Sequence, residues 1–249
     1  MGSSHQSPID IRTRNVGYDS LLKPLKFHYD PKTSKRIFNT GHCFNVEFDD
    51  QKDISLLSGG PLTGHYRLCQ FHFHWGLSDS EGSEHTIDGK AFPAELHIVH
   101  WNSQKYRNFS EAKDHPDGLS VVGILLKLGE KNPALQAIVE NLDKVKTKGK
   151  ECRFTTFDLS SLLPKDLNYW TYHGSLTTNP WSECVTWIIL QEFITITPTQ
   201  LEKFRSLLST EQDNDPCNIL ENHREIQALQ GRVVRSSCAV NKKTNKKNT

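Results

Sequence analysis

The sequence predicts a mainly β protein of the α+β class, a single domain built on a large twisted, mostly antiparallel central sheet with short peripheral helices. Three observations predict this fold. Short runs of alternating apolar and polar residues, rich in aromatic and β-branched side chains, recur along most of the 249 residues. Turn-forming clusters such as 58–61 and 80–83 separate these runs. Only two segments have apolar residues at helical spacing, and neither a repeat nor a linker divides the chain.

Several runs have the length and composition of strands. They are residues 25–29, 36–39, 44–48, 66–75, 94–101, 119–127, 185–190 and 193–197. The run 119–127 is almost continuously apolar, as expected of a buried strand. Because the runs follow one another at short intervals with few helices between them, we expect them to pair in one sheet in which antiparallel neighbours dominate.

Two helices are predicted, both as packing elements. The first has Asn132 as its N-cap and Pro133 at its first position, and it ends near Gly149. The second begins at Thr197 and Pro198. Their apolar faces are formed by Leu135, Ile138, Val139 and Leu142 in the first helix and by Leu201, Phe204, Leu207 and Leu208 in the second.

Composition limits the partners and the compartment. Residues 1–240 are predicted to form the domain, and residues 241–249, with four lysines and no apolar residue, a basic disordered tail. The net charge is only +1, and there is neither an apolar run of membrane-spanning length nor a secretory leader. The six cysteines are scattered without a CxxC pair, which is typical of free thiols in a reducing compartment. We therefore expect a cytoplasmic protein that binds neither nucleic acid nor membranes.

The most informative stretch is 70–76, with the sequence QFHFHWG. Its strict alternation predicts a half-buried strand on which Gln70, His72 and His74 share one face. The opposite face carries the aromatic residues Phe71, Phe73 and Trp75. Two imidazoles side by side on a rigid strand indicate a site rather than a core.

A second run, 94–101, repeats the arrangement. Glu95, His97 and Val99 share one face, whereas His100 points to the other. A single strand histidine is most often at the surface or hydrogen-bonded in the core, and we interpret His100 in that way.

If the two runs pair, His97 meets His72 and His74 across the ladder. Gln70 and Glu95 can then accept the second ring N–H groups of these histidines. Ligation by nitrogen alone suits zinc, and three protein ligands leave a fourth position open for water. An open position indicates catalysis rather than a structural metal.

Several longer motifs together resemble the α-class carbonic anhydrases, and the resemblance extends from about Ser7 to about Ser237. The motifs are residues 70–76, 82–89, 94–102, 169–172 and 174–178. The family fold is a large twisted, mostly antiparallel sheet, in agreement with the strand pattern.

The resemblance implies reversible hydration of carbon dioxide to bicarbonate and a proton, with Zn²⁺ held by His72, His74 and His97. Zinc lowers the pKa of its bound water to about 7, a value known for this enzyme family, so that zinc-bound hydroxide attacks carbon dioxide. The released proton must leave through a group that titrates near neutrality. His42 lies at the family's proton-shuttle position.

The resemblance also implies roles for residues that the pattern alone does not single out. Thr177 is the hydroxyl that orients the attacking group, and Glu84 is its acceptor. The substrate pocket is lined by Val99, Val121, Leu176, Thr178 and Trp187, of which only Val99 follows independently from alternation.

We expect a monomer that acts on a small molecule, carbon dioxide or bicarbonate. Two alternatives remain open: a catalytically inactive relative that serves as a binding module, and a zinc esterase. Inactive relatives lose zinc histidines, which this chain retains. The esterase is poorly supported, because neither a Ser/His/Asp order nor an HExxH helix is present.

Overall fold

The computed structural model describes residues 4–239, and strands account for most of the regular structure. In chain order they are β1 (Asp10–Ile11), β2 (Gly17–Tyr18), β3 (Leu25–His28), β4 (Ser34–Asn39), β5 (Phe44–Phe48), β6 (Leu56–Gly59), β7 (His65–Trp75), β8 (Thr86–Ile87), β9 (Ala94–Trp101), β10 (Leu119–Leu128), β11 (Glu151–Arg153), β12 (Tyr169–Gly174), β13 (Val185–Leu190), β14 (Ile194–Ile196) and β15 (Arg235–Ser236). The helices are α1 (Phe109–Ala112), α2 (Pro133–Val139) and α3 (Pro198–Arg205). The predicted basic tail, 241–249, lies outside the described residues.

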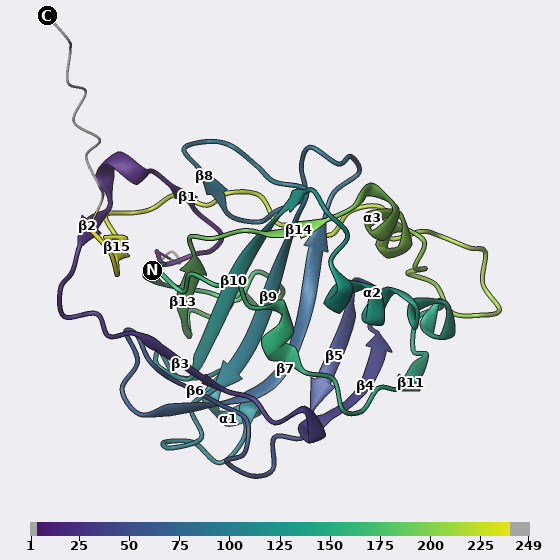
Figure 1. The fold of residues 1–249 in the computed structure, drawn as a ribbon, viewed down its shortest axis with the longest axis horizontal. Helices are drawn as coiled ribbons and strands as arrows, with labels where there is room; N and C mark the ends of the chain where they lie inside the picture. Colours follow the sequence, from purple (N-terminus) through teal and green to yellow (C-terminus); the bar gives the residue numbers. More distant parts are fainter. Residues whose placement is uncertain (1–3, 240–249) are drawn as a thin grey trace, which may run out of the picture.

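One 13-stranded sheet contains nearly all of these strands, in the order β11-β4-β5-β7-β9-β10-β13-β12-β15-β2, with β3, β6 and β14 attached beside it. Figure 1 shows its long middle strands side by side and progressively rotated, with α2 and α3 at one end. Most neighbours are antiparallel, whereas β10 runs parallel to β13 and β14. The predicted fold class is therefore confirmed.

Each predicted strand is present, with ends that shift by at most two residues. The structure adds β6, β12 and several two- or three-residue strands at the periphery. The short strands give too few alternations to show a period of two, and β12, with the sequence YWTYHG, does not alternate between apolar and polar residues.

The aromatic face of β7 packs into the main core. Phe71, Phe73 and Trp75 are fully buried. Phe204 of α3 packs on them, with ring centroids 5.0 Å from Phe73 and 5.4 Å from Trp75. Each such side chain contributes about 1.5–3 kcal/mol through burial. The strand that carries the histidines is thus anchored by its opposite face.

The second predicted helix is present but ends at Arg205, before the buried Leu207 and Leu208, and the first also ends earlier than expected. α3 begins with a capping box in which Thr197 and Gln200 satisfy each other's backbone N–H groups. α2 has the predicted Asn132 cap but stops at Val139, not near Gly149. The helix ends because Asn141 breaks the helical pattern of hydrogen bonds. The backbone N–H of Asn141 donates to the carbonyl oxygen of Ile138, and its side chain donates to the carbonyl oxygen of Ala137 (2.9 Å). A separate 3-10 turn, Leu142–Val145, follows.

His100 is a hydrogen-bonded core residue on β9, all of whose residues are buried. Its Nε2 lies 2.7 Å from the Tyr29 hydroxyl, and its Nδ1 donates to the carbonyl oxygen of Ser120 (3.2 Å). Burial lowers the pKa of His100 to about 3. The ring therefore stays neutral in the folded protein throughout the range in which an exposed histidine titrates.

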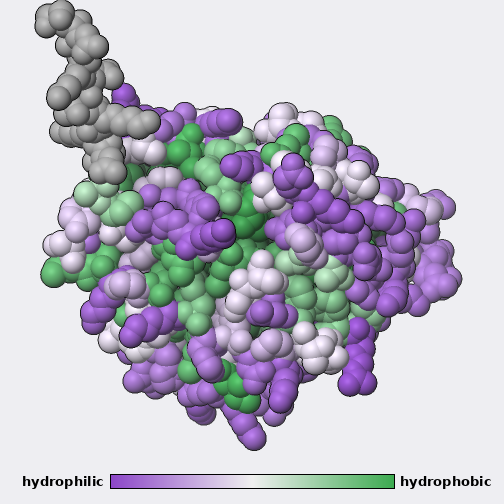
Figure 2. All heavy atoms as spheres, in the orientation of Figure 1, coloured by the Kyte–Doolittle hydropathy of each residue, from purple (hydrophilic) through white to green (hydrophobic). Residues whose placement is uncertain are grey.

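The described surface is mixed in character. Figure 2 shows hydrophobic side chains over the middle of one face, next to a largely hydrophilic area around α3 and the segment after it. No helix within residues 4–239 has the length and apolar character needed to cross a membrane.

Replacing His100 by Gln should flatten the pH dependence of stability. Below its ordinary pKa of 6.5, His100 takes up a proton only in the unfolded chain, so wild-type stability is lost as pH falls from 6.5 toward about 3. Between pH 4 and 5.5 His100 should make the wild-type free energy of unfolding fall by about 1.4 kcal/mol for each pH unit, and the variant should lack this contribution. Urea unfolding at several pH values measures this difference, and parallel curves for the two proteins would contradict it.

Candidate metal centre and active site

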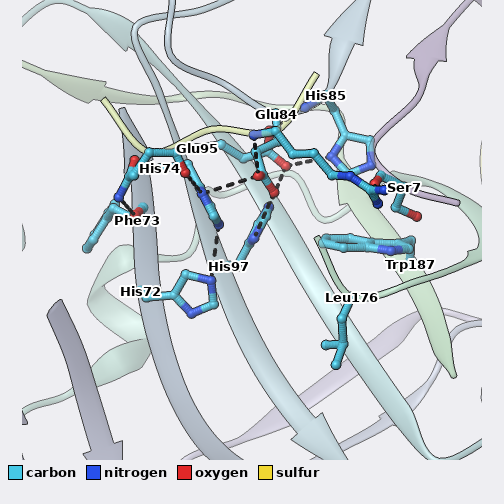
Figure 3. A network of polar contacts seen from close by, with 12 residues as sticks. Ser7, His72, Phe73, His74, Glu84, His85, Glu95, His97, Leu176 and Trp187 are labelled. Carbon is cyan, nitrogen blue, oxygen red and sulfur yellow. Dashed lines mark hydrogen bonds and ion pairs between the residues drawn. The ribbon is translucent and has the colours of Figure 1, made fainter. Parts of the chain in front are cut away.

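Three histidines meet where β7 pairs with β9. His72 lies directly opposite His97 in the antiparallel ladder, and His74 follows on the same face of β7. The ring centroids of His74 and His97 are 4.6 Å apart, and those of His72 and His74 are 5.0 Å apart. One nitrogen of each ring lies within 4.8 Å of the other two. Figure 3 shows the rings turned toward one another from the two strands.

Each imidazole donates from its outer nitrogen to an oxygen. The three pairs are His72 Nδ1 to Gln70 Oε1 (2.9 Å), His74 Nδ1 to the carbonyl oxygen of Asn222 (2.9 Å) and His97 Nε2 to Glu95 Oε1 (2.7 Å). A neutral imidazole that donates from one nitrogen carries a lone pair on the other. All three lone pairs therefore point to the same place.

The inner nitrogens fit a metal cation. Nε2 of His72 and Nε2 of His74 are 3.2 Å apart, and because both carry lone pairs they cannot hydrogen-bond to each other. Metal–nitrogen bonds of about 2.0–2.1 Å in a tetrahedron would place two such atoms about 3.3 Å apart. Burial lowers the pKa of both rings and outweighs the opposing effect of Glu84 on His74, and His97 lowers the pKa of both further. Both rings thus stay in the neutral form that binds metals.

Glu95 is fully buried and orients two histidines. Besides the bond from His97, it accepts bonds from the ring and from the backbone N–H of His85, both at 2.7 Å. Burial alone would raise the pKa of Glu95, but His85 and His97 lower it well below its ordinary value. The contacts continue from His85 Nε2 to the Tyr172 hydroxyl (2.6 Å) and from there to Ser7 Oγ (2.9 Å). The carboxylate therefore stays charged within a fixed network.

Glu84 is the second buried carboxylate at the cluster. Its Oε1 accepts the backbone N–H of Arg224 (2.9 Å) and lies 3.3 Å from Nδ1 of His74. Its Oε2 is buried without a hydrogen-bond partner. The expected hydrogen bond from Thr177 to Glu84 is therefore not present. Thr177 lines the adjacent cavity instead.

A cavity of about 280 Å³ lies over the histidines. Its apolar wall follows the strand register, in which Val99 pairs with Val121 and Val121 with Trp187. Leu176, from the loop after β12, also lines the cavity, and Thr178 contributes at its exposed edge. All five residues expected to line a substrate pocket thus border one cavity (Figure 3 shows Leu176 and Trp187 beside the cluster).

His42 lies on the exposed side of the same cavity, in the loop between β4 and β5. This loop is held by short-range hydrogen bonds. Thr40 Oγ1 accepts the backbone N–H groups of His42 (3.2 Å) and Cys43 (3.1 Å), and Asn39 Oδ1 accepts that of Gly41 (2.8 Å). Gly41 has a φ of +86°, which a residue with a side chain rarely adopts.

A larger cavity, of about 460 Å³, lies between segments 10–16 and 226–234. It is lined by neither histidine nor cysteine. Its residues therefore offer no nitrogen or sulfur ligand for a metal, and the smaller cavity is the better candidate for an active site.

The sequence offered no signal for Asn222 and Arg224. Their main-chain groups hold His74 and Glu84, from 148 and 140 residues away. Because backbone atoms make these hydrogen bonds, the residue types at the two positions do not indicate them. His85 and Tyr172 do lie inside the quoted motifs, but neither period nor spacing shows that they touch.

Comparison with known proteins agrees with the site. A family model described as eukaryotic-type carbonic anhydrase matches residues 1–238. "Carbonic anhydrase 1" of Monodelphis domestica is 52% identical over 233 residues, which cover 94% of this chain and 89% of that protein. "Carbonic anhydrase 1" of Mus musculus is 53% identical over 234 residues, which cover 94% of this chain and 90% of that protein. With a match of this extent and a histidine cluster that fits a metal, the chain belongs to the eukaryotic-type carbonic anhydrase family.

Proposed function

We propose that this protein catalyses the reversible hydration of carbon dioxide to bicarbonate and a proton, with zinc held by His72, His74 and His97. The observation that carries the proposal is the convergence of three imidazole lone pairs, each directed by an acceptor on the opposite nitrogen. Family membership supports the same reaction.

The donor set favours zinc among metal ions. It consists of three nitrogens, with Gln70 and Glu95 as hydrogen-bonded supports, and it leaves room for one further ligand. Zinc bound there supplies Lewis-acid activation of water at neutral pH. The protein keeps His72 and His74 in their neutral form and provides the pocket.

The substrate position is the apolar wall of the cavity, formed by Val99, Val121, Leu176 and Trp187. Carbon dioxide is small and apolar, so an apolar surface beside the histidines suits it better than charged groups would. Thr178, at the edge of the cavity, offers a hydroxyl to the more polar bicarbonate.

Thr177 and Glu84 are assigned to orienting the attacking oxygen. Glu84 Oε2 is a buried acceptor without a donor, which costs about 1–3 kcal/mol unless a donor arrives. The Thr177 hydroxyl, in the lining of the same site, is a donor of the required kind. A threonine hydroxyl that donates its hydrogen to a carboxylate can only accept a hydrogen bond from the attacking oxygen. This hydrogen bond fixes the orientation of the attacking oxygen.

His42 is assigned to proton export. It lies at the exposed side of the cavity, away from the metal ligands, where an imidazole can exchange protons with solvent. We further assign residues 1–240 to one catalytic domain that acts as a monomer, without nucleic-acid or membrane partners. A cytosolic location is supported by six cysteines that are all free thiols.

Zinc analysis followed by stopped-flow hydration of carbon dioxide tests the proposal against its alternatives. We expect one zinc per chain and rapid hydration. A folded protein without bound metal and without activity would favour a binding module instead. Rapid hydrolysis of activated esters with negligible hydration would favour a zinc esterase.

Replacing His97 by Ala should weaken zinc binding by more than the 10–100-fold that is typical when a group supporting a ligand is lost. One of three donors is removed, and Glu95 loses a partner. His100→Ala is the matched control, because it lies on the same strand but faces the core. Competition with a chromophoric chelator measures both affinities, and equal losses would show that His97 is not a ligand.

Replacing His42 by Ala should slow hydration in weak buffer on the order of ten- to a hundredfold, because a positioned proton-transfer group is lost. Small imidazole buffers should restore the rate. His28→Ala serves as control, since His28 is also exposed but lies on β3, outside the cavity. An unchanged rate in weak buffer would remove His42 from the mechanism.

A further inference from the structure

The end of β7 that carries His74 lacks a neighbouring strand on one side. β5 pairs with β7 only from Glu47 opposite Gln70 to Asn45 opposite His72. Beyond that point the chain leaves the sheet as the loop 40–43, which carries His42. The peptide groups of Phe73 and Trp75 that face this side are buried with their residues and need other partners.

Asn222 supplies those partners. Its side-chain Oδ1 accepts the backbone N–H of Trp75 (2.8 Å), and its Nδ2 donates to the carbonyl oxygen of Phe73 (3.2 Å). Its backbone N–H donates to the carbonyl oxygen of Trp75 (3.2 Å). The side-chain amide thus stands where a peptide group of the next strand would otherwise be.

The same amide reaches the loop. The second hydrogen of Asn222 Nδ2 donates to the carbonyl oxygen of His42 (3.0 Å). The loop's own hydrogen bonds, through Thr40 and Asn39, fix its shape but not its place against β7. One amide group therefore joins the strand of the metal ligands to the loop of the exposed histidine.

We propose that the side-chain amide of Asn222 is a positioning group that fixes the loop 40–43 against β7 and so sets the place of His42 relative to the histidine cluster. This inference rests on the proposed function, in which His42 exports the proton. Proton transfer depends steeply on the distance between donor and acceptor, so a displaced loop slows it while the metal ligands stay in place.

Two variants separate the side chain from the backbone of this residue. Asn222→Ala removes the amide, whereas Asn222→Asp keeps its size and its acceptor but places an oxygen that cannot donate against the carbonyl oxygens of Phe73 and His42. The carbonyl oxygen that orients His74 remains in both. Asn102→Ala is the matched control, because this asparagine is 1% exposed and donates to the carbonyl oxygen of Asp117 (3.2 Å), outside the cavity.

The first measurement needs no catalysis. Hydrogen exchange of the backbone amides of residues 40–45 in the zinc-loaded proteins should be at least about fivefold faster in both Asn222 variants and unchanged in Asn102→Ala. Unchanged exchange in the Asn222 variants would overturn the proposal.

The second measurement uses the steady-state rates of hydration. In weak buffer kcat should fall about tenfold in Asn222→Asp and recover with imidazole buffer, while kcat/KM and zinc content stay within about twofold of wild type. A parallel fall of kcat, kcat/KM and zinc content would show that the amide acts on the metal ligands instead, and would overturn the assignment to His42.

A double-mutant cycle closes the test. In a His42→Ala background, Asn222→Asp should lower kcat in weak buffer no further, because both changes act through one imidazole. A second full loss would overturn the proposal. If His42→Ala alone leaves kcat unchanged, the proton-export role itself fails, whereas faster exchange in Asn222→Asp still supports the structural tie.

Discussion

The site depends on one constraint, which is that a buried neutral imidazole must donate its N–H to an acceptor, and the acceptor then decides where the lone pair points. Gln70 lies on β7 with His72, Glu95 lies on β9 with His97, and Asn222, the acceptor for His74, lies far along the chain. Because two paired strands and the segment around Asn222 supply these acceptors, the lone pairs converge as a property of the folded protein. A metal ion then completes a geometry that already exists.

Strand β7 meets two requirements at once because its side chains alternate between faces. The aromatic face is buried against α3, and this packing fixes the backbone from which the histidines project. On β10, Gly123 lies opposite His97, and a Cβ there would be 3.2 Å from Glu95 Oε1 and 2.6 Å from Ile189. The absence of a side chain at this position thus leaves room for the carboxylate that orients His97.

Much of the fold and the centre of the site was predictable, because alternation fixes which side chains share a face. The register irregularity at Leu68–Gln70 lies before the ligand residues and leaves their alternation intact. Thr177, Glu84 and His42 came from family resemblance alone, since no period singles them out. Asn222 was out of reach, because its partners lie about 150–180 residues earlier in the chain and no local pattern connects it with them. The early end of α2 was equally hidden, since one local hydrogen bond decides it.

The great separation between His74 and its acceptor has a consequence for the order of assembly. Strands β7 and β9 follow each other closely in sequence, so a growing chain can pair them while its C-terminal third is still being synthesised. The acceptor that directs the His74 ring lies 148 residues later, so it is synthesised long after the two strands. The ring of His74 therefore gains its acceptor only after the segment around Asn222 has docked along the edge of β7.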